Sequence, residues 1–133
     1  MKIAICSSEV FPYAKTGGLA DVTGALPIAL AKLDHEVKVF MPWYKNVKPQ
    51  KIMQDYGITR NGLAEFYFIK NDNYFMRDAL YGTPQGDYAD NLERFSFYSK
   101  QVLELLKKID FCPDILHVND WQAAFVNIYL KTL

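Results

Sequence analysis

The sequence is poor in cysteine and histidine, and neither sign of charge is in excess. Two cysteines, Cys6 and Cys112, are too few for a disulfide framework, so we expect reduced thiols in a cytoplasmic protein. Two histidines, His35 and His117, argue against a metal site built on histidine ligands. Fifteen basic and fifteen acidic residues cancel, which argues against bulk electrostatic binding to nucleic acid or to an acidic membrane.

Long hydrophobic runs are also missing. The first residues, MKIAICSSEVF, are interrupted by Ser7, Ser8 and Glu9 too early for a signal peptide. No apolar run approaches the ~20 residues that a membrane-spanning helix needs. Half of the 133 residues are nevertheless hydrophobic, which excludes a disordered chain and allows one domain with a real core.

The hydrophobic pattern predicts alternating strands and helices. Residues 2–7 and 36–41 are short apolar runs typical of buried strands, and a helix with an apolar face lies between them. That face comprises Leu19, Val22, Leu26, Leu30 and Leu33, and Pro27 is expected to bend the helix. A strand, helix and strand in this order form a right-handed crossover between parallel strands.

The rest of the chain continues this pattern. We expect a long helix over 91–109, a buried strand over 114–118 and a further helix over 121–133. Shorter strands are expected at 51–53, 64–70 and 73–76, with a turn at 71–73 and a loop at 81–87. The predicted fold class is therefore α/β, a Rossmann-like parallel sheet flanked by helices.

The stretch KTGG places Lys15 just before Gly17 and Gly18, where the first strand turns into the first helix. A helix start offers free N–H groups and a positive dipole end, and glycines let an anion approach the backbone. The order of residues fits neither the P-loop nor the G-x-G-x-x-G fingerprint. The stretch therefore indicates either a diphosphate site or a surface lysine beside a flexible loop.

Other candidate residues follow the strands at the same predicted sheet edge. If strands 2–7 and 114–118 are neighbours, Glu9, Lys15, Asp21 and Asp120 gather there. Asp120 either caps the next helix or holds sugar hydroxyls, with Trp121 as an apolar platform, and His117 is expected in the core.

The stretch YADNLERF, residues 88–95, leaves a similar choice. Asp90 or Asn91 caps the long helix, or Tyr88, Asp90 and Asn91 line the same cleft.

Four stretches in order, SSEVFPYAKTGGLADVTGALP, DHEVKVFMPWY, YADNLERF and DILHVNDWQAA, resemble the start of the bacterial glycogen synthase and plant starch synthase family. The resemblance covers essentially the whole chain. It implies the GT-B arrangement of two Rossmann-like domains across a cleft, with residues 1–133 forming part of the N-terminal domain and the C-terminal nucleotide-binding domain absent. It also implies transfer of glucose from ADP-glucose to the non-reducing end of an α-1,4-glucan such as glycogen, with retention of configuration and without metal or cofactor.

The resemblance also implies roles for individual residues. Lys15 matches a lysine that contacts the donor phosphates, and Gly17 and Gly18 match the loop that approaches the diphosphate and the sugar. The residues that match the sugar and acceptor cleft are Glu9, Asp21 and Asp120, with Tyr88 and Asn91 as weaker assignments.

Some features depart from the family pattern. Gln122 stands where a histidine is usual, which leaves its role open, and Asp34 stands where glycine is usual. The catalytic residues are expected beyond Leu133, so the resemblance implies that this chain alone is inactive and binds nucleotide sugar weakly at best.

Two other functions remain as alternatives. A dinucleotide-binding oxidoreductase is disfavoured, because the fingerprint glycines are absent and no acidic residue ends the strand EVKVFM. A nucleotide-sugar-binding or glucan-binding module that works alone, without catalysis, stays open.

Overall fold

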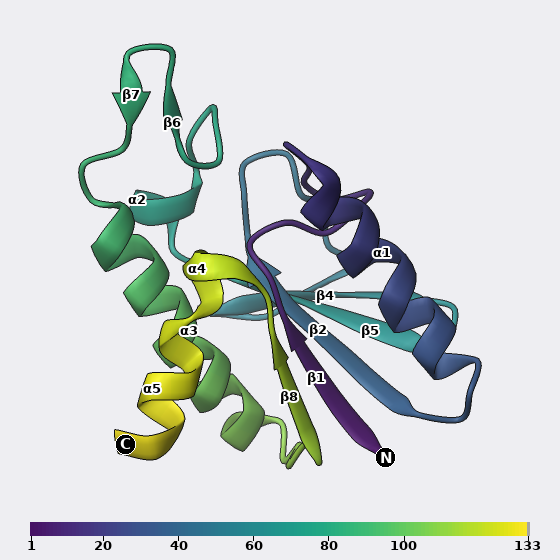
Figure 1. The fold of residues 1–133 in the computed structure, drawn as a ribbon. Helices are drawn as coiled ribbons and strands as arrows, with labels where there is room; N and C mark the ends of the chain where they lie inside the picture. The colour runs from purple at the N-terminus through teal and green to yellow at the C-terminus, as the bar shows by residue number, and fades with distance from the viewer. Residues whose placement is uncertain (133) are drawn as a thin grey trace.

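The computed structural model describes residues 1–132 and shows a six-stranded, mostly parallel sheet with helices on both faces (Figure 1). The strands of this sheet are β1 (Lys2–Cys6), β2 (Glu36–Pro42), β3 (Lys51–Ile52), β4 (Tyr56–Asn61), β5 (Ala64–Ile69) and β8 (Ile115–Val118). The helices are α1 (Gly18–Ala31), α2 (Asp72–Phe75), α3 (Asn91–Lys108), α4 (Asp120–Ala123) and α5 (Phe125–Thr132). A separate hairpin consists of β6 (Gly82–Thr83) and β7 (Gly86–Asp87).

The strand order is β3-β4-β5-β2-β1-β8. β1 is parallel to both of its neighbours, β2 and β8, while β4 is antiparallel to β3 and β5. From β1 the chain passes to β2, crosses to β3 at the edge of the sheet and comes back through β4 to β5 beside β2; it then places β8 on the other side of β1. Ligands of open α/β sheets bind at such a reversal, outside the carboxyl ends of the two strands.

The helices form two layers around the sheet. α1 lies on one face, and α3 with α5 lies on the other (Figure 1). Because both faces are covered, β1 and β2 contribute fully buried side chains at successive positions, including Ile5, Cys6, Val39 and Phe40. The predicted α/β class is confirmed, and within residues 1–132 no helix is long and apolar enough to cross a membrane.

The apolar face predicted for the first helix is confirmed only in part, because Leu26 and Leu30 are half-buried and pack against the core while Val22 and Leu33 do not. Val22 is 56% exposed and Leu33 is 67% exposed, and the residues that α1 buries are small or compact: Ala20, Thr23, Pro27 and Ala31. A side-chain carbon at Gly24 would lie only 2.6 Å from the carbonyl oxygen of Phe11, so the preceding loop approaches this face closely. The side of α1 that is buried is therefore set by the close approach of the loop backbone at Phe11 more than by the size of the helix side chains.

The strand predicted at 73–76 and the turn at 71–73 are also wrong. Residues 72–75 form the short helix α2, and the side chain of Asn71 caps it by accepting a hydrogen bond from the Tyr74 N–H at 3.1 Å. The residues after β5 thus start a helix, while the antiparallel partner of β5 is β4, which precedes it and was not predicted.

β8 is an edge strand in this chain. Ile115 is 43% exposed and His117 is exposed, so the expectation of a core histidine is wrong. An apolar strand sequence indicates burial but does not indicate which neighbour supplies it. The helix expected over 121–133 is divided into α4 and α5, and its last residue lies outside the described residues.

Candidate functional site

The carboxyl ends of β1 and β8 are tied directly to each other. The backbone N–H of Asn119, at 3.0 Å, and its side-chain Nδ2, at 3.1 Å, both donate to the carbonyl oxygen of Cys6. The two chain segments that leave these strands therefore begin side by side. This confirms the condition under which Glu9, Lys15, Asp21 and Asp120 were expected at one edge of the sheet, namely that the two strands are neighbours.

Residues 15–18, which we call the anion loop, lead into the open start of α1. Gly17 occupies the N-cap position in an extended conformation (φ −151°, ψ −163°), and no side chain caps the helix. A side-chain carbon built at either Gly17 or Gly18 would meet nothing within 4 Å. The helix start therefore combines a positive dipole end with free space for a group that approaches the backbone.

Glu9 holds this loop from inside the protein. The residue is only 4% exposed, and its carboxylate accepts hydrogen bonds from the Thr16 N–H and hydroxyl, each at 2.5 Å, and from the Gly17 N–H at 3.2 Å. The Tyr81 hydroxyl donates to the same carboxylate at 2.7 Å. Burial acts to raise the pKa of Glu9, but the hydrogen bonds from Thr16, Tyr81 and Gly17 outweigh it and lower the pKa.

Lys15 forms an ion pair with Asp21. Its Nζ lies 2.7 Å from both carboxylate oxygens of Asp21, one turn into α1, and both side chains are about half exposed. Exposed ion pairs contribute little to stability. Asp21 therefore holds the Lys15 ammonium beside the helix start without burying it, and an anion can reach it from solvent.

Asp120 lies at the end of β8 in the left-handed region, with φ of 60°. Its carboxylate accepts from the Trp121 N–H at 2.8 Å, while Asn119 occupies the N-cap position of α4. The indole of Trp121 is 50% exposed and meets the ring of Phe95 edge-on at 5.3 Å between centroids. An exposed carboxylate beside an exposed indole suits the predicted sugar-binding role of Asp120, which stays a prediction.

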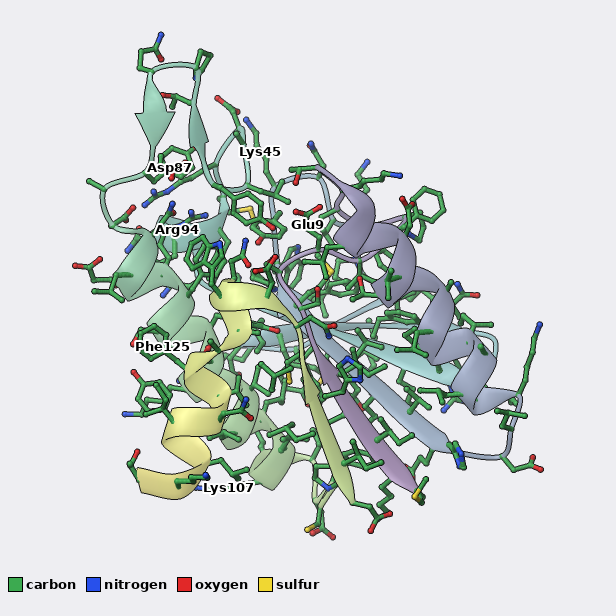
Figure 2. All side chains as sticks on the ribbon, in the orientation of Figure 1. Glu9, Lys45, Asp87, Arg94, Lys107 and Phe125 are labelled. Carbon is green, nitrogen blue, oxygen red and sulfur yellow. The ribbon has the colours of Figure 1, made fainter. Side chains whose placement is uncertain are left out.

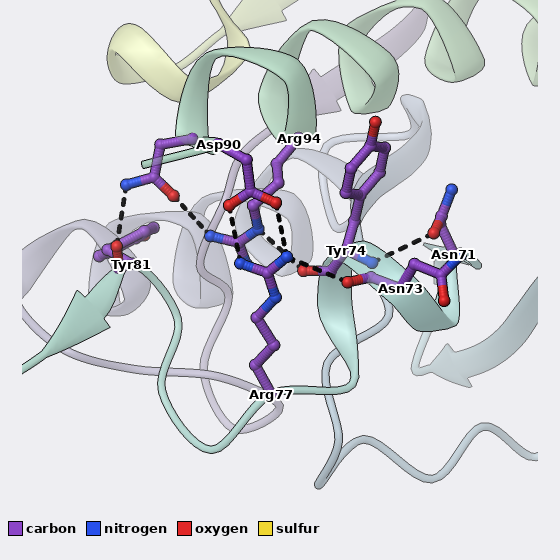
Figure 3. Close-up of polar contacts among 8 residues, drawn as sticks. Asn71, Asn73, Tyr74, Arg77, Tyr81, Asp90 and Arg94 are labelled. Atoms are coloured by element: carbon purple, nitrogen blue, oxygen red, sulfur yellow. Dashed lines mark hydrogen bonds and ion pairs between the residues drawn. The ribbon is translucent and has the colours of Figure 1, made fainter. Parts of the chain in front are cut away.

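Asp90 and Arg94, at the start of α3, belong to a network of hydrogen bonds (Figure 3). Asp90 is the N-cap residue but makes no side-chain cap; its carboxylate instead accepts from Arg77 at 2.6 and 2.8 Å, which lowers its pKa. The guanidinium carbons of Arg77 and Arg94 lie 4.7 and 5.0 Å from the centroid of the Tyr88 ring. Asn91 is 9% exposed and faces this network, so its side chain contacts the protein interior and not the open edge of the sheet.

Arg94 is the largest fully buried side chain in the described part of the chain. Its Nε donates to the Tyr74 carbonyl oxygen at 2.8 Å and its Nη1 to Asn91 Oδ1 at 2.6 Å. Within residues 1–132 no carboxylate pairs with it, and Nη2 has no hydrogen-bond partner. Burial lowers the pKa of its guanidinium, although neighbouring hydroxyl and carboxylate groups oppose this.

Sequence reasoning missed Tyr81 and Arg94 as parts of the site. Arg94 stands one position before Phe95 and four before Tyr98, on the helix face that enters the core, and this placement is the one available signal. Tyr81 lies in an irregular segment whose sequence gives no comparable signal. Gln122, whose role was left open, is 5% exposed, and its Oε1 has no partner within residues 1–132.

The topological switch, the open glycine-lined helix start and the adjacent lysine define a partial Rossmann-like domain of the GT-B glycosyltransferase class. The sequence matches the family model described as the starch synthase catalytic domain over residues 2–133, and the chain belongs to this family.

Named relatives and a solved structure agree with this assignment. The chain is similar to glycogen synthase from Geotalea uraniireducens, with 45% identity over 149 aligned positions, which cover 98% of this chain and 31% of the relative. Glycogen synthase from Koribacter versatilis is also 45% identical, with 100% and 31% coverage. The catalytic domain of starch synthase IV from Arabidopsis thaliana, bound to ADP and acarbose, matches with a TM-score of 0.81, 30% identity, and coverage of 99% of this chain and 30% of that one. The chain thus spans about a third of the length of its relatives.

Proposed function

We propose that this chain is the N-terminal part of an ADP-glucose-dependent glycogen synthase of the cytoplasm. In this proposal the full-length enzyme transfers glucose from ADP-glucose to the non-reducing end of an α-1,4-glucan and retains the anomeric configuration. The observation that carries the proposal is the anion loop, where two glycines open onto free space at a helix start beside Lys15. A diphosphate is the group in a nucleotide sugar that such a site suits.

The contacts of the anion loop suggest how the donor is held. The Gly17 N–H is already bonded to Glu9, so the backbone donors left for a phosphate are those of the first turn of α1, beginning at Gly18. Lys15 supplies the positive charge by turning from Asp21 toward the diphosphate, since exposed ion pairs exchange at little cost. Asp21, once released, and Asp120 are then free to accept hydrogen bonds from sugar hydroxyls.

The rest of the enzyme is expected to come from the part of the relatives that this chain does not cover. Glycosyl transfer from a nucleotide sugar needs positive groups that stabilise the departing diphosphate, and electrostatic stabilisation of this kind is the main catalytic term in many enzymes. The anion loop supplies one ammonium and one helix start. We therefore propose that the isolated chain has no measurable transferase activity and that the groups opposite the anion loop belong to a second domain.

The test uses the full-length protein with ADP-glucose as donor and glycogen as acceptor. Wild-type protein is expected to elongate glycogen, and Lys15→Ala is expected to lose about 30- to 150-fold in kcat/KM, because removing one partner of a close charge contact costs about 2–3 kcal/mol. Lys107→Ala is the matched control, since this exposed lysine lies at the opposite end of the molecule from Glu9 (Figure 2).

Two results would contradict the proposal in different ways. No glucose transfer by the full-length wild-type protein would leave the non-catalytic binding module as the better reading. Wild-type kinetics in Lys15→Ala would show that the anion loop does not hold the donor. UDP-glucose in place of ADP-glucose measures how strictly the nucleotide is selected.

A further inference from the structure

We propose that Asn91 is a positioning residue for the anion loop and acts through Tyr81 and Glu9. The inference rests on the proposed function, because the quantity it predicts is the affinity for the donor. Nothing in it requires Asn91 to touch a substrate. Figure 2 shows Glu9 and Arg94, the two ends of the connection, at the same end of the molecule.

The connection begins at the buried guanidinium of Arg94. This group lies among the rings of Phe75, Tyr88 and Phe95, with its central carbon 5.0–5.5 Å from their centroids. A buried cation without a carboxylate partner needs strong neutral acceptors. Asn91 Oδ1 is one of them, at 2.6 Å from Nη1, so the orientation of the Asn91 amide is set by Arg94.

The other end of the same amide holds the segment that carries Tyr81. Asn91 Nδ2 donates to the Tyr81 carbonyl oxygen at 2.8 Å, and the backbone N–H of Tyr88 donates to the same oxygen at 2.9 Å. An amide satisfies both demands because it has an acceptor and a donor on one rigid group. An aspartate of the same shape keeps the acceptor and loses the donor.

Tyr81 then reaches across to the first loop of the chain. Its hydroxyl lies 2.7 Å from the carboxylate of Glu9 and 2.7 Å from the hydroxyl of Ser8, and its ring packs 5.9 Å from that of Phe95. Glu9 in turn binds the N–H groups of Thr16 and Gly17. The hydrogen bond between Tyr81 and Glu9, which are 72 residues apart in sequence, therefore helps to fix the position of the anion loop.

The anion loop depends on this outside support because little else holds it. Lys15, Thr16, Gly17 and Gly18 are exposed, and the start of α1 has no side-chain cap. If Tyr81 moves, Glu9 loses the hydrogen bond from its hydroxyl and the anion loop samples more conformations. Binding of ADP-glucose must then order the loop again, which costs affinity. Such a loss weakens ground-state and transition-state binding equally, and it raises KM for the donor without lowering kcat.

The experiment measures initial rates of the full-length synthase for Asn91→Asp, Tyr81→Phe and the double variant, with ADP-glucose varied at saturating glycogen. Asn91→Asp is expected to raise KM for ADP-glucose about tenfold, equivalent to about 1.4 kcal/mol, with kcat changed less than about twofold. Tyr81→Phe is expected to raise KM by a similar factor. Because the two residues act in series, the double variant is expected to raise KM about as much as either single variant.

A purely structural role predicts a different result. Partial misfolding lowers the fraction of active enzyme and therefore kcat, and it leaves KM unchanged. Asn91→Asp also gives the buried Arg94 guanidinium a charged hydrogen-bond acceptor, which stabilises the folded protein. The thermal midpoint of the Asn91→Asp variant is therefore expected to be no lower than that of the wild type. The controls are Asn127→Asp, an exposed position on α5, and Tyr129→Phe, whose hydroxyl bonds Ser96 and not the anion loop.

The outcomes separate this inference from the proposed function. An active wild-type enzyme whose Asn91→Asp variant keeps the wild-type KM, or loses kcat alone, overturns the positioning role and leaves the proposed function intact. KM increases that multiply in the double variant overturn the serial connection. A wild-type protein that transfers no glucose overturns the proposed function itself, and the positioning role falls with it.

Discussion

Replacing Glu9 with glutamine removes one charge from beneath the anion loop and keeps the size of the side chain. The carboxylate accepts four hydrogen bonds, from the Thr16 N–H and hydroxyl, the Gly17 N–H and the Tyr81 hydroxyl. Hydrogen bonds to a charged group contribute about 1.5–3 kcal/mol and neutral ones about 1 kcal/mol, while burial of the charge opposes this gain. We expect Glu9→Gln to lower the free energy of unfolding by about 2 kcal/mol at pH 7.

The pH dependence of this difference has a definite sign. The pKa of Glu9 in the folded protein lies below its ordinary value of 4.5, so the carboxylate adds stability above that value and loses it as the pH falls through the folded pKa. The gap between wild type and Glu9→Gln is therefore expected to be constant from neutral pH down to about 5 and to close below about 4.5.

Urea unfolding followed by tryptophan fluorescence measures this gap, because Trp43 is buried and Trp121 is half exposed. Glu104→Gln is the control, since Glu104 forms only a 3.6 Å surface pair with Lys107 and its loss is expected to cost at most about 0.5 kcal/mol. The reasoning is refuted if Glu9→Gln matches the wild type at pH 7, or if its gap stays the same at pH 3.5.

Three further results are expected. Burial raises the pKa of Glu65, but hydrogen bonds from Lys38 and Arg60 outweigh it and hold the pKa at about 2. Glu65→Gln is therefore expected to lower the free energy of unfolding by about 1–2 kcal/mol at pH 7 and by progressively less as the pH falls from about 4.5 toward 2. Equal decreases at pH 7 and pH 3 in urea unfolding would contradict this. Gly24→Ala is expected to destabilise the protein by about 1–3 kcal/mol in thermal unfolding, despite the better helix propensity of alanine, because the new carbon meets the Phe11 carbonyl oxygen at 2.6 Å. In Gly18→Ala the new carbon meets nothing within 4 Å, so the thermal midpoint is expected to stay unchanged while KM for ADP-glucose rises at least about tenfold. An unchanged KM would show that the donor does not use this space.

Much of the fold could be read from the sequence because it depends on local pattern. Continuous apolar runs correctly placed β1, β2 and β5, and helical spacing correctly placed α3. The same reasoning failed where an element is short or where its surroundings decide. Residues 72–75 became a helix through the Asn71 cap, and α1 turned its small residues inward because the loop at Phe11 needs close approach.

The site shows the same division. The sequence alone determined that a lysine and two glycines meet a helix start, since these residues are adjacent in the chain and their backbone preferences are local. Only the tertiary structure decided that Glu9 holds the loop from beneath, that Asp21 pairs with Lys15, and that Tyr81 connects the loop to Asn91 and Arg94. Those contacts join segments up to 72 residues apart, and their partners are chosen by which strands become neighbours, a choice that the pattern of any one segment does not contain.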